Sequence, residues 1–215
     1  MATNLNGKRI LITAGPTWVA IDAVRVISNT ASGKTGILLA KVLARLGAKV
    51  TLLLGPVGTY CIDKKIRVID FKFFDELNSS LRKELKGKRF DIVIHSAAVS
   101  DYRPKSVSRK KISSSAKNLS LTLKQTPKII NHLRKISPCS LLIGFKFEPG
   151  LSENSLISKA RSLIKRAQLD LAVANTAGRN GYKAWIVSTD EKLGPFSKKE
   201  ELVINLSALI KNAGN

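Results

Sequence analysis

Short apolar runs alternate along the chain with longer segments whose apolar residues recur at helical spacing. The runs predict buried strands, and the longer segments predict helices. The predicted strands are Arg9–Thr13, Lys49–Leu54, Ile66–Phe71, Phe90–His95, Leu141–Phe145, Leu171–Asn175 and Ala184–Ser188, and the predicted helices are Lys34–Leu46, Phe74–Leu85, Ser152–Arg166 and Lys198–Asn212. Because strands and helices alternate, we expect a doubly wound α/β sheet, with Ala184–Ser188 added as an edge strand. No internal repeat or low-complexity tract breaks the pattern, so residues 1–215 are expected to form a single domain.

The segment 101–125 interrupts this alternation. Arg103-Pro104 and Ser113–Ser115 are typical of loops, whereas Leu119–Lys124 alternates as an exposed strand does. We therefore expect a flap that contains a small antiparallel hairpin. Thr126 and Pro127 then predict a helix start, with threonine as N-cap and proline in the first turn. The free N–H groups of such a start are a candidate anion site.

A long polar connection separates the first predicted strand from the first predicted helix. Its second half, residues 25–36, reads R-V-I-S-N-T-A-S-G-K-T-G. In open parallel sheets, ligands bind at the carboxyl ends of strands and at helix N-termini. Gly33 and Gly36 flank Lys34 and let backbone N–H groups approach an anion closely. The alternative is a helix start that Ser32 merely caps. We favour a binding loop, because so long a connection is uncommon without a function.

The common nucleotide-binding motifs are absent from this connection. A phosphate-binding P-loop would need glycine where Ser28 stands, and Gly15-Pro16-Thr17 does not begin a G-x-G-x-x-G fingerprint. The sequence also gives little support for a dehydrogenase. Tyr60 and Lys64 have the Tyr-x-x-x-Lys spacing but follow the second strand, so an NADP-dependent reductase is disfavoured.

Positive charge is concentrated in one part of the chain. The net charge is +22, and the stretch from Tyr102 to Phe147 holds eleven Lys or Arg and no Asp or Glu. This concentration predicts an anionic ligand, a nucleic acid, or both.

Composition also bears on where the protein works. No apolar run is long enough to span a membrane, and the N-terminus lacks the apolar core of a signal peptide. Cys61 and Cys139 are far apart and match no metal-ligand spacing, which favours reduced thiols in a cytoplasmic protein.

Few residues stand out as acids, bases or nucleophiles. His95 and His132 have no carboxylate nearby in sequence, so core or surface roles are expected. Asp101 follows a strand end, where it could reach a ribose or a metal-bound phosphate, or simply cap a loop. Lys110 and Lys111 on the flap could close over a triphosphate and stabilise charge on a transferring phosphoryl group. Solvated surface lysines are the alternative.

Several motifs, in order and at similar spacing, resemble one family: the phosphopantothenate–cysteine ligases, or phosphopantothenoylcysteine synthetases, of coenzyme A biosynthesis. The matching stretches are Ile12–Thr17 (I-T-A-G-P-T), Ile21–Arg25 (I-D-A-V-R), Ile27–Asn29 (I-S-N), Ser32–Gly36 (S-G-K-T-G), Ala97–Tyr102 (A-A-V-S-D-Y), Gly144–Glu148 (G-F-K-F-E) and Leu169–Asn175 (L-D-L-A-V-A-N). The chain departs from the family at Trp18–Ala20, where Arg-Glu-Pro is frequent, and at Ser113-Ser114, where lysines are frequent.

The resemblance implies a Rossmann-like fold and a two-step reaction. A nucleoside triphosphate, with CTP favoured over ATP, activates the carboxylate of 4′-phosphopantothenate as an acyl-nucleotidylate with Mg²⁺. The amine of L-cysteine then displaces the nucleoside monophosphate. The resemblance further implies a homodimer in which the flap region meets the partner subunit. Many bacterial members are fused behind a flavin-dependent decarboxylase. This chain resembles the stand-alone form, for which a separate decarboxylase partner is expected.

The same resemblance implies roles for individual residues, although the metal ligands stay unknown. Arg25 and Asn29 would hold phosphopantothenate and the acyl intermediate, and Lys111 would act in the activation step. Ser32, Gly33 and Ala98 would line the substrate pocket. The nucleotide would contact Ser96, Ala97, Asp101, Lys111, Thr126, Pro127, Lys128, Ile129, Phe145 (against the base) and Lys165 (at the triphosphate).

One alternative comes from another functional class. The basic stretch between Tyr102 and Phe147 could bind RNA or DNA on a Rossmann-like scaffold without any ligase activity. Between these two ends Phe145 is the one Phe, Tyr or Trp, and this scarcity of base-stacking aromatics disfavours nucleic acid as a partner.

Overall fold

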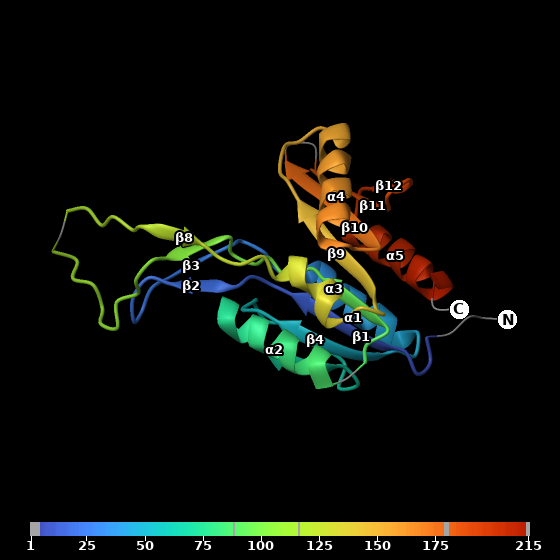
Figure 1. Ribbon diagram of the computed structural model, residues 1–215, viewed down its shortest axis with the longest axis horizontal. Helices are drawn as coiled ribbons and strands as arrows, with labels where there is room; N and C mark the ends of the chain where they lie inside the picture. Colours follow the sequence, from blue (N-terminus) through green and yellow to red (C-terminus); the bar gives the residue numbers. More distant parts are fainter. Residues whose placement is uncertain (1–4, 88, 116, 179–180, 214–215) are drawn as a thin grey trace.

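The computed structural model describes residues 5–87, 89–115, 117–178 and 181–213, and its centre is an eight-stranded sheet (Figure 1). The strand order is β12-β11-β10-β9-β6-β1-β4-β5. The bounds are β1 (Arg9–Ala14), β4 (Lys49–Leu54), β5 (Arg67–Asp70), β6 (Ile92–His95), β9 (Leu141–Phe147), β10 (Leu171–Gly178), β11 (Gly181–Val187) and β12 (Lys192–Phe196). The strands from β10 to β5 are parallel to one another. β11 pairs antiparallel with β10, and β12 pairs antiparallel with β11. The predicted mostly parallel, Rossmann-like sheet is confirmed.

Helices cover both faces of the sheet. The bounds are α1 (Lys34–Arg45), α2 (Phe74–Gly87), the 3₁₀-helix η1 (Ile129–His132), α3 (Leu133–Ile136), α4 (Glu153–Ala167) and α5 (Lys199–Ala213). Successive side chains of a strand point to opposite faces, so Ile10 and Ile12 pack with α1 and α5. Leu11 lies in the second core with α2 and α4. Burial on both faces explains why the strands read as nearly continuous apolar runs.

The outermost strand was not expected. β12 pairs with β11, which places β11 inside the sheet and not at the edge predicted for Ala184–Ser188. Its sequence contains Gly194-Pro195, a pair typical of turns. An edge strand tolerates proline, because one side of its backbone makes no ladder hydrogen bonds.

Two short antiparallel ribbons leave the same end of the sheet and project away from it (Figure 1). One pairs β2 (Trp18–Ala20) with β3 (Val26–Ser28), and the other pairs β7 (Tyr102–Pro104) with β8 (Leu123–Gln125). We call these ribbons, together with the turn 21–25 and the loop residues 105–115 and 117–122, the arm. The hairpin expected in the flap is confirmed, although its second strand is shorter than the predicted one. The β2–β3 ribbon was expected as a loop, because its strands are too short to show a period.

The helix predicted to begin at Thr126 begins later. The Thr126 side chain is buried and donates to the carbonyl of Ser100, so it does not cap a helix. The backbone turns at Lys128 instead, and η1 and α3 follow. The prediction was wrong because a contact between distant segments took the threonine hydroxyl. None of the described helices combines the length and hydropathy needed to cross a bilayer.

A buried polar pair joins two neighbouring strands inside the sheet. Thr13 on β1 and His95 on β6 are register partners, and Thr13 Oγ1 lies 2.8 Å from His95 Nδ1. Burial lowers the pKa of His95 to about 4. The imidazole is therefore neutral at neutral pH, in keeping with the core role expected from the sequence.

This pair predicts a pH dependence of stability. The unfolded chain binds a proton at His95 near its ordinary pKa of about 6.5, whereas the folded chain resists it. The His95 contribution is therefore complete above pH 6.5 and is lost as the pH falls toward 4, by up to roughly 3 kcal/mol. Urea unfolding between pH 7 and pH 4.5 should show a steep loss in the native protein and a shallower one in His95→Asn.

His132→Asn is the matched control, because His132 lies on the surface. Its pH dependence should follow that of the native protein. Parallel curves for the native protein and His95→Asn would contradict the assignment of a neutral buried imidazole.

Candidate functional site

A cleft opens where the direction of strand order reverses. From β1 the chain runs to β4 and β5 on one side, and then returns through β6, β9 and β10 on the other. Neighbouring connections therefore diverge at the carboxyl ends of β1 and β6, which is where open α/β sheets bind ligands. A cavity of about 650 Å³ lies at this point. Its walls come from the ends of β1, β6, β9 and β10, the start of β11, the beginnings of α1 and α5, and residues 127–130.

The beginning of α1 forms one wall of the cleft. Gly33 is the N-cap residue with φ 68°, a left-handed conformation that favours glycine, and it offers no side-chain cap. No acidic residue stands in the first turn of α1. Gly36 brings the helix close to the sheet, because a Cβ there would lie 2.5 Å from Ala14 Cβ and 2.8 Å from Ser96 Oγ. The Lys34 N–H donates to Ser32 Oγ at 3.4 Å, and the N–H groups of Thr35 and Gly36 that follow make this wall suited to an anion.

The segment that follows β6 is fastened to the end of β1 by hydrogen bonds. Ser96 Oγ donates to the Thr13 carbonyl at 2.7 Å, and the Ala97 N–H donates to Thr13 Oγ1 at 3.2 Å. The Ala98 N–H donates to the Gly15 carbonyl at 2.9 Å. Asn29 Nδ2 donates to the Ala98 carbonyl at 3.0 Å, which fixes the asparagine on the rim.

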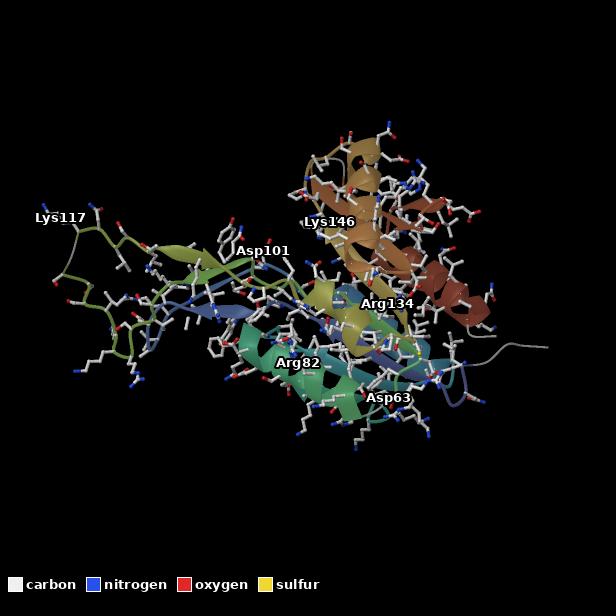
Figure 2. The ribbon with its side chains drawn as sticks, viewed as in Figure 1. Asp63, Arg82, Asp101, Lys117, Arg134 and Lys146 are labelled. Carbon is white, nitrogen blue, oxygen red and sulfur yellow. The ribbon has the colours of Figure 1, made fainter. Side chains whose placement is uncertain are left out.

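Cations surround the cleft. Lys34 at the start of α1 pairs with Glu200 at 2.9 Å, and Lys146 on β9 pairs with Glu148 at 2.8 Å. Lys128 pairs with Asp101. Figure 2 shows Asp101 at the root of the arm and Lys146 on β9. Asp101 is the one carboxylate among the described residues that line the cleft, against Lys34, Lys128, Lys146, Arg166 and Lys199, so the cleft attracts anionic ligands.

Most of the residues predicted for the site line this one cleft. They are Asn29, Ser32, Gly33, Ser96, Ala97, Ala98, Asp101, Pro127, Lys128, Ile129 and Phe145. Their proximity is a property of the structure, whereas their roles stay predictions. Four predicted residues do not line it: Arg25, Lys111, Thr126 and Lys165.

These four residues lie outside the cleft for separate physical reasons. Thr126 is buried in its contact with Ser100. Lys165 is exposed on α4, and the next residue, Arg166, lines the cleft instead, because one helical step turns a side chain by about 100°. Arg25 and Lys111 belong to the arm.

Arg25 takes part in a polar junction between the two ribbons. Its guanidinium donates to Asp22 Oδ2 and to the Ile112 carbonyl, both at 3.2 Å. The Asp22 carboxylate accepts from the Ile112 N–H at 3.0 Å. That hydrogen bond is the largest of the causes that lower the pKa of Asp22. The junction anchors the flap directly beside Lys111.

Other residues of the cleft were not singled out from the sequence. The sequence could have indicated Asn175, because it is a polar residue near the end of a buried strand within a matching motif. Lys34 and Lys146 lay within matching motifs as well. No sequence feature indicated Tyr182 or Lys199, since β11 and α5 bring them to the cleft from distant parts of the chain.

Comparison with known proteins places the chain in a family. The model of the DNA/pantothenate metabolism flavoprotein C-terminal domain matches residues 5–211. The coenzyme A biosynthesis bifunctional protein CoaBC of Thermococcus kodakarensis is 41% identical over 204 residues, covering 92% of this chain and 49% of that protein. The chain spans about half the length of the curated relatives it matches.

Two solved structures have the same fold. The DNA/pantothenate metabolism flavoprotein from Streptococcus pneumoniae superposes with a TM-score of 0.86 at 26% identity, over 96% of this chain and 100% of that one. The C-terminal domain of CoaBC superposes with a TM-score of 0.81 at 28% identity, over 99% of this chain and 98% of that one. The family resemblance read from the motifs is therefore confirmed, and the chain belongs to the DNA/pantothenate metabolism flavoprotein C-terminal domain family.

Proposed function

We propose that the chain is a phosphopantothenate–cysteine ligase that joins 4′-phosphopantothenate to L-cysteine through an acyl-nucleotidylate. One observation carries the proposal: stretches that resemble this family, far apart in sequence, gather around a single cationic cleft beside the start of α1. The relatives support it, because the chain aligns with nearly the whole of a solved C-terminal domain of CoaBC, which is named for coenzyme A biosynthesis.

The reaction has two displacements. A carboxylate oxygen of phosphopantothenate attacks the α-phosphorus of the nucleotide, and pyrophosphate leaves. The amine of cysteine then attacks the acyl carbon, the nucleoside monophosphate leaves with the bonding electrons, and the amine nitrogen loses a proton. Both steps depend on orientation and on stabilisation of negative charge more than on a nucleophilic side chain.

The cleft supplies both requirements. The start of α1 would receive the phosphates, and Lys128 and Lys146 would offset their charge. Asn29 is held in place by the Ala98 carbonyl, so its amide is preorganised at the rim for the acyl intermediate. Phe145, which lines the cleft and is half-buried, would pack on the base. CTP is favoured over ATP on the resemblance to bacterial ligases.

Mg²⁺ would accompany the nucleotide in this scheme. Mg²⁺ usually binds through phosphate oxygens, water and one or two carboxylates. Asp101 lines the cleft and fits that modest requirement. Within the described ranges, no three His, Cys, Asp or Glu side chains gather as a dedicated metal centre. The ion would neutralise charge on the leaving pyrophosphate.

Arg25 and Lys111 would act through a second copy of the chain. Both lie on the arm, outside the cleft of their own subunit. The arm also exposes the apolar side chains of Val24, Val26, Ile27, Tyr102 and Leu123. Exposed apolar groups that lie together mark interaction surfaces. We infer a homodimer joined through the arms, in which Arg25 and Lys111 of one subunit serve the cleft of the other.

The ligase proposal predicts pyrophosphate release. The protein with phosphopantothenate, cysteine and CTP should release pyrophosphate, and faster with CTP than with ATP. Asn29→Ala should slow amide formation by about 100-fold, because a preorganised polar group contributes on this scale. The matched control is Asn205→Ala, whose Nδ2 donates to the Glu201 carbonyl on α5, outside the cleft. Folded dimeric protein that releases no pyrophosphate with either nucleotide would remove the ligase proposal.

Sites shared between two subunits predict that two inactive variants complement each other. Asn29→Ala and Lys111→Gln homodimers should each be nearly inactive. After unfolding and refolding together, half of the dimers are mixed, and each mixed dimer has one cleft with an intact Asn29 and a partner with an intact Lys111. The mixture should therefore recover about a quarter of native activity.

A mixture as inactive as its parents would show that Lys111 serves its own cleft. Lys110→Gln is the matched control, because it removes the neighbouring charge without touching the position beside Ile112. Lys110→Gln homodimers should keep close to native activity.

A further inference from the structure

Two polar atoms at the far end of the cleft lack hydrogen-bond partners. They are Asn175 Oδ1 on β10 and the Tyr182 hydroxyl on β11, and both residues line the cavity. Each atom is shielded from solvent, and neither has a partner among the residues that the structure describes. Buried polar groups without partners are rare in native proteins and call for an explanation.

The two groups point to the same side of the sheet. In the β10–β11 ladder, Asn175 pairs with Ala184, and Ala177 pairs with Tyr182. These pairs are two residues apart along each strand, so all four side chains share one face. Ala184 and Tyr182 pack in the core beneath α1 and α5, which identifies that face. The start of α1 therefore lies on the same side as the Tyr182 ring.

The chemistry of this corner favours an anion. Burial raises the pKa of Tyr182 to about 12, so the phenol keeps its proton and acts as a donor at neutral pH. Lys199 Nζ lies 5.8 Å from the centre of the Tyr182 ring. Lys34 lines the same cleft from α1. A protonated donor beside cations is suited to a charged oxygen acceptor, since hydrogen bonds to ionised groups are the strong ones.

We propose that the Tyr182 hydroxyl donates a hydrogen bond to a phosphate oxygen of the bound nucleoside triphosphate. The inference rests on the proposed function for the nucleotide, and it identifies Tyr182 as a residue that selects the polyphosphate and not the base. The base is expected against Phe145 of β9, whereas Tyr182 lies beside Lys199 and shares the cleft with Lys34, and these cations are suited to phosphate oxygens.

The test uses Tyr182→Phe, which removes one oxygen and keeps the ring. Calorimetric titration of the native protein with inorganic tripolyphosphate should give saturable binding, weakened about 10-fold or more in Tyr182→Phe. CTP should weaken similarly, while cytidine should bind both proteins equally. Tyr60→Phe is the matched control, because the Tyr60 hydroxyl donates to Asp70 at 3.3 Å outside the cleft. It should bind like the native protein.

The outcomes separate this inference from the ligase proposal and from a structural role. Tripolyphosphate binding requires no catalysis, so it is measured even if pyrophosphate release fails. A hydroxyl that waits for a ligand contributes nothing to the free protein, so Tyr182→Phe should melt at or above the native temperature. Equal tripolyphosphate affinity in both proteins, no binding by the native protein, or a lowered melting temperature would each overturn the proposal.

Discussion

The parallel pairing of β1 with β6 is the interaction on which the cleft depends. These strands come from distant parts of the chain, and their adjacency creates the point where neighbouring connections diverge. Hydrogen bonds from Ser96 and Ala97 to Thr13 continue the contact beyond the last register pair. Gly36 lets α1 approach this junction closely. The floor, the rim and the anion-attracting wall of the cleft therefore share one rigid support, which is what orientation-dependent chemistry needs.

The arm is organised by a second contact, the Asp22 carboxylate. It accepts from the N–H groups of Val24 and Arg25 in its own ribbon and from the Ile112 N–H in the flap. Several donors on one carboxylate stabilise its charged form, in keeping with its lowered pKa. The exposed loop that carries Lys111 is thus tied at Ile112 to the turn between β2 and β3. This combination suits a segment that must reach another subunit and still present a lysine in a defined place.

The proposed chemistry explains why the site looks as it does. An acyl-nucleotidylate ligase replaces a poor leaving group by a good one, so its protein groups mainly hold and neutralise. The cleft accordingly has lysines, a helix start and a fixed asparagine where a hydrolase would have a nucleophile and base. His95 lines the cleft but is neutral and bonded to Thr13, so it belongs to the scaffold. The unpartnered hydroxyl of Tyr182 extends the same principle to the phosphate end.

The sequence by itself determined the α/β alternation, the parallel sheet and most of the cleft. Apolar period is a local property, and residues that follow parallel strands meet at one sheet edge, so Asn29, Ser96 and Phe145 could be brought together in advance. Only the tertiary structure decided that Thr126 is buried and caps nothing, that β12 adds an edge despite Pro195, and that Arg166 replaces Lys165. It alone brought Tyr182 and Lys199 to the cleft and separated Arg25 and Lys111 from it. Each of these depends on contacts between segments far apart in the chain, and no local pattern encodes such contacts.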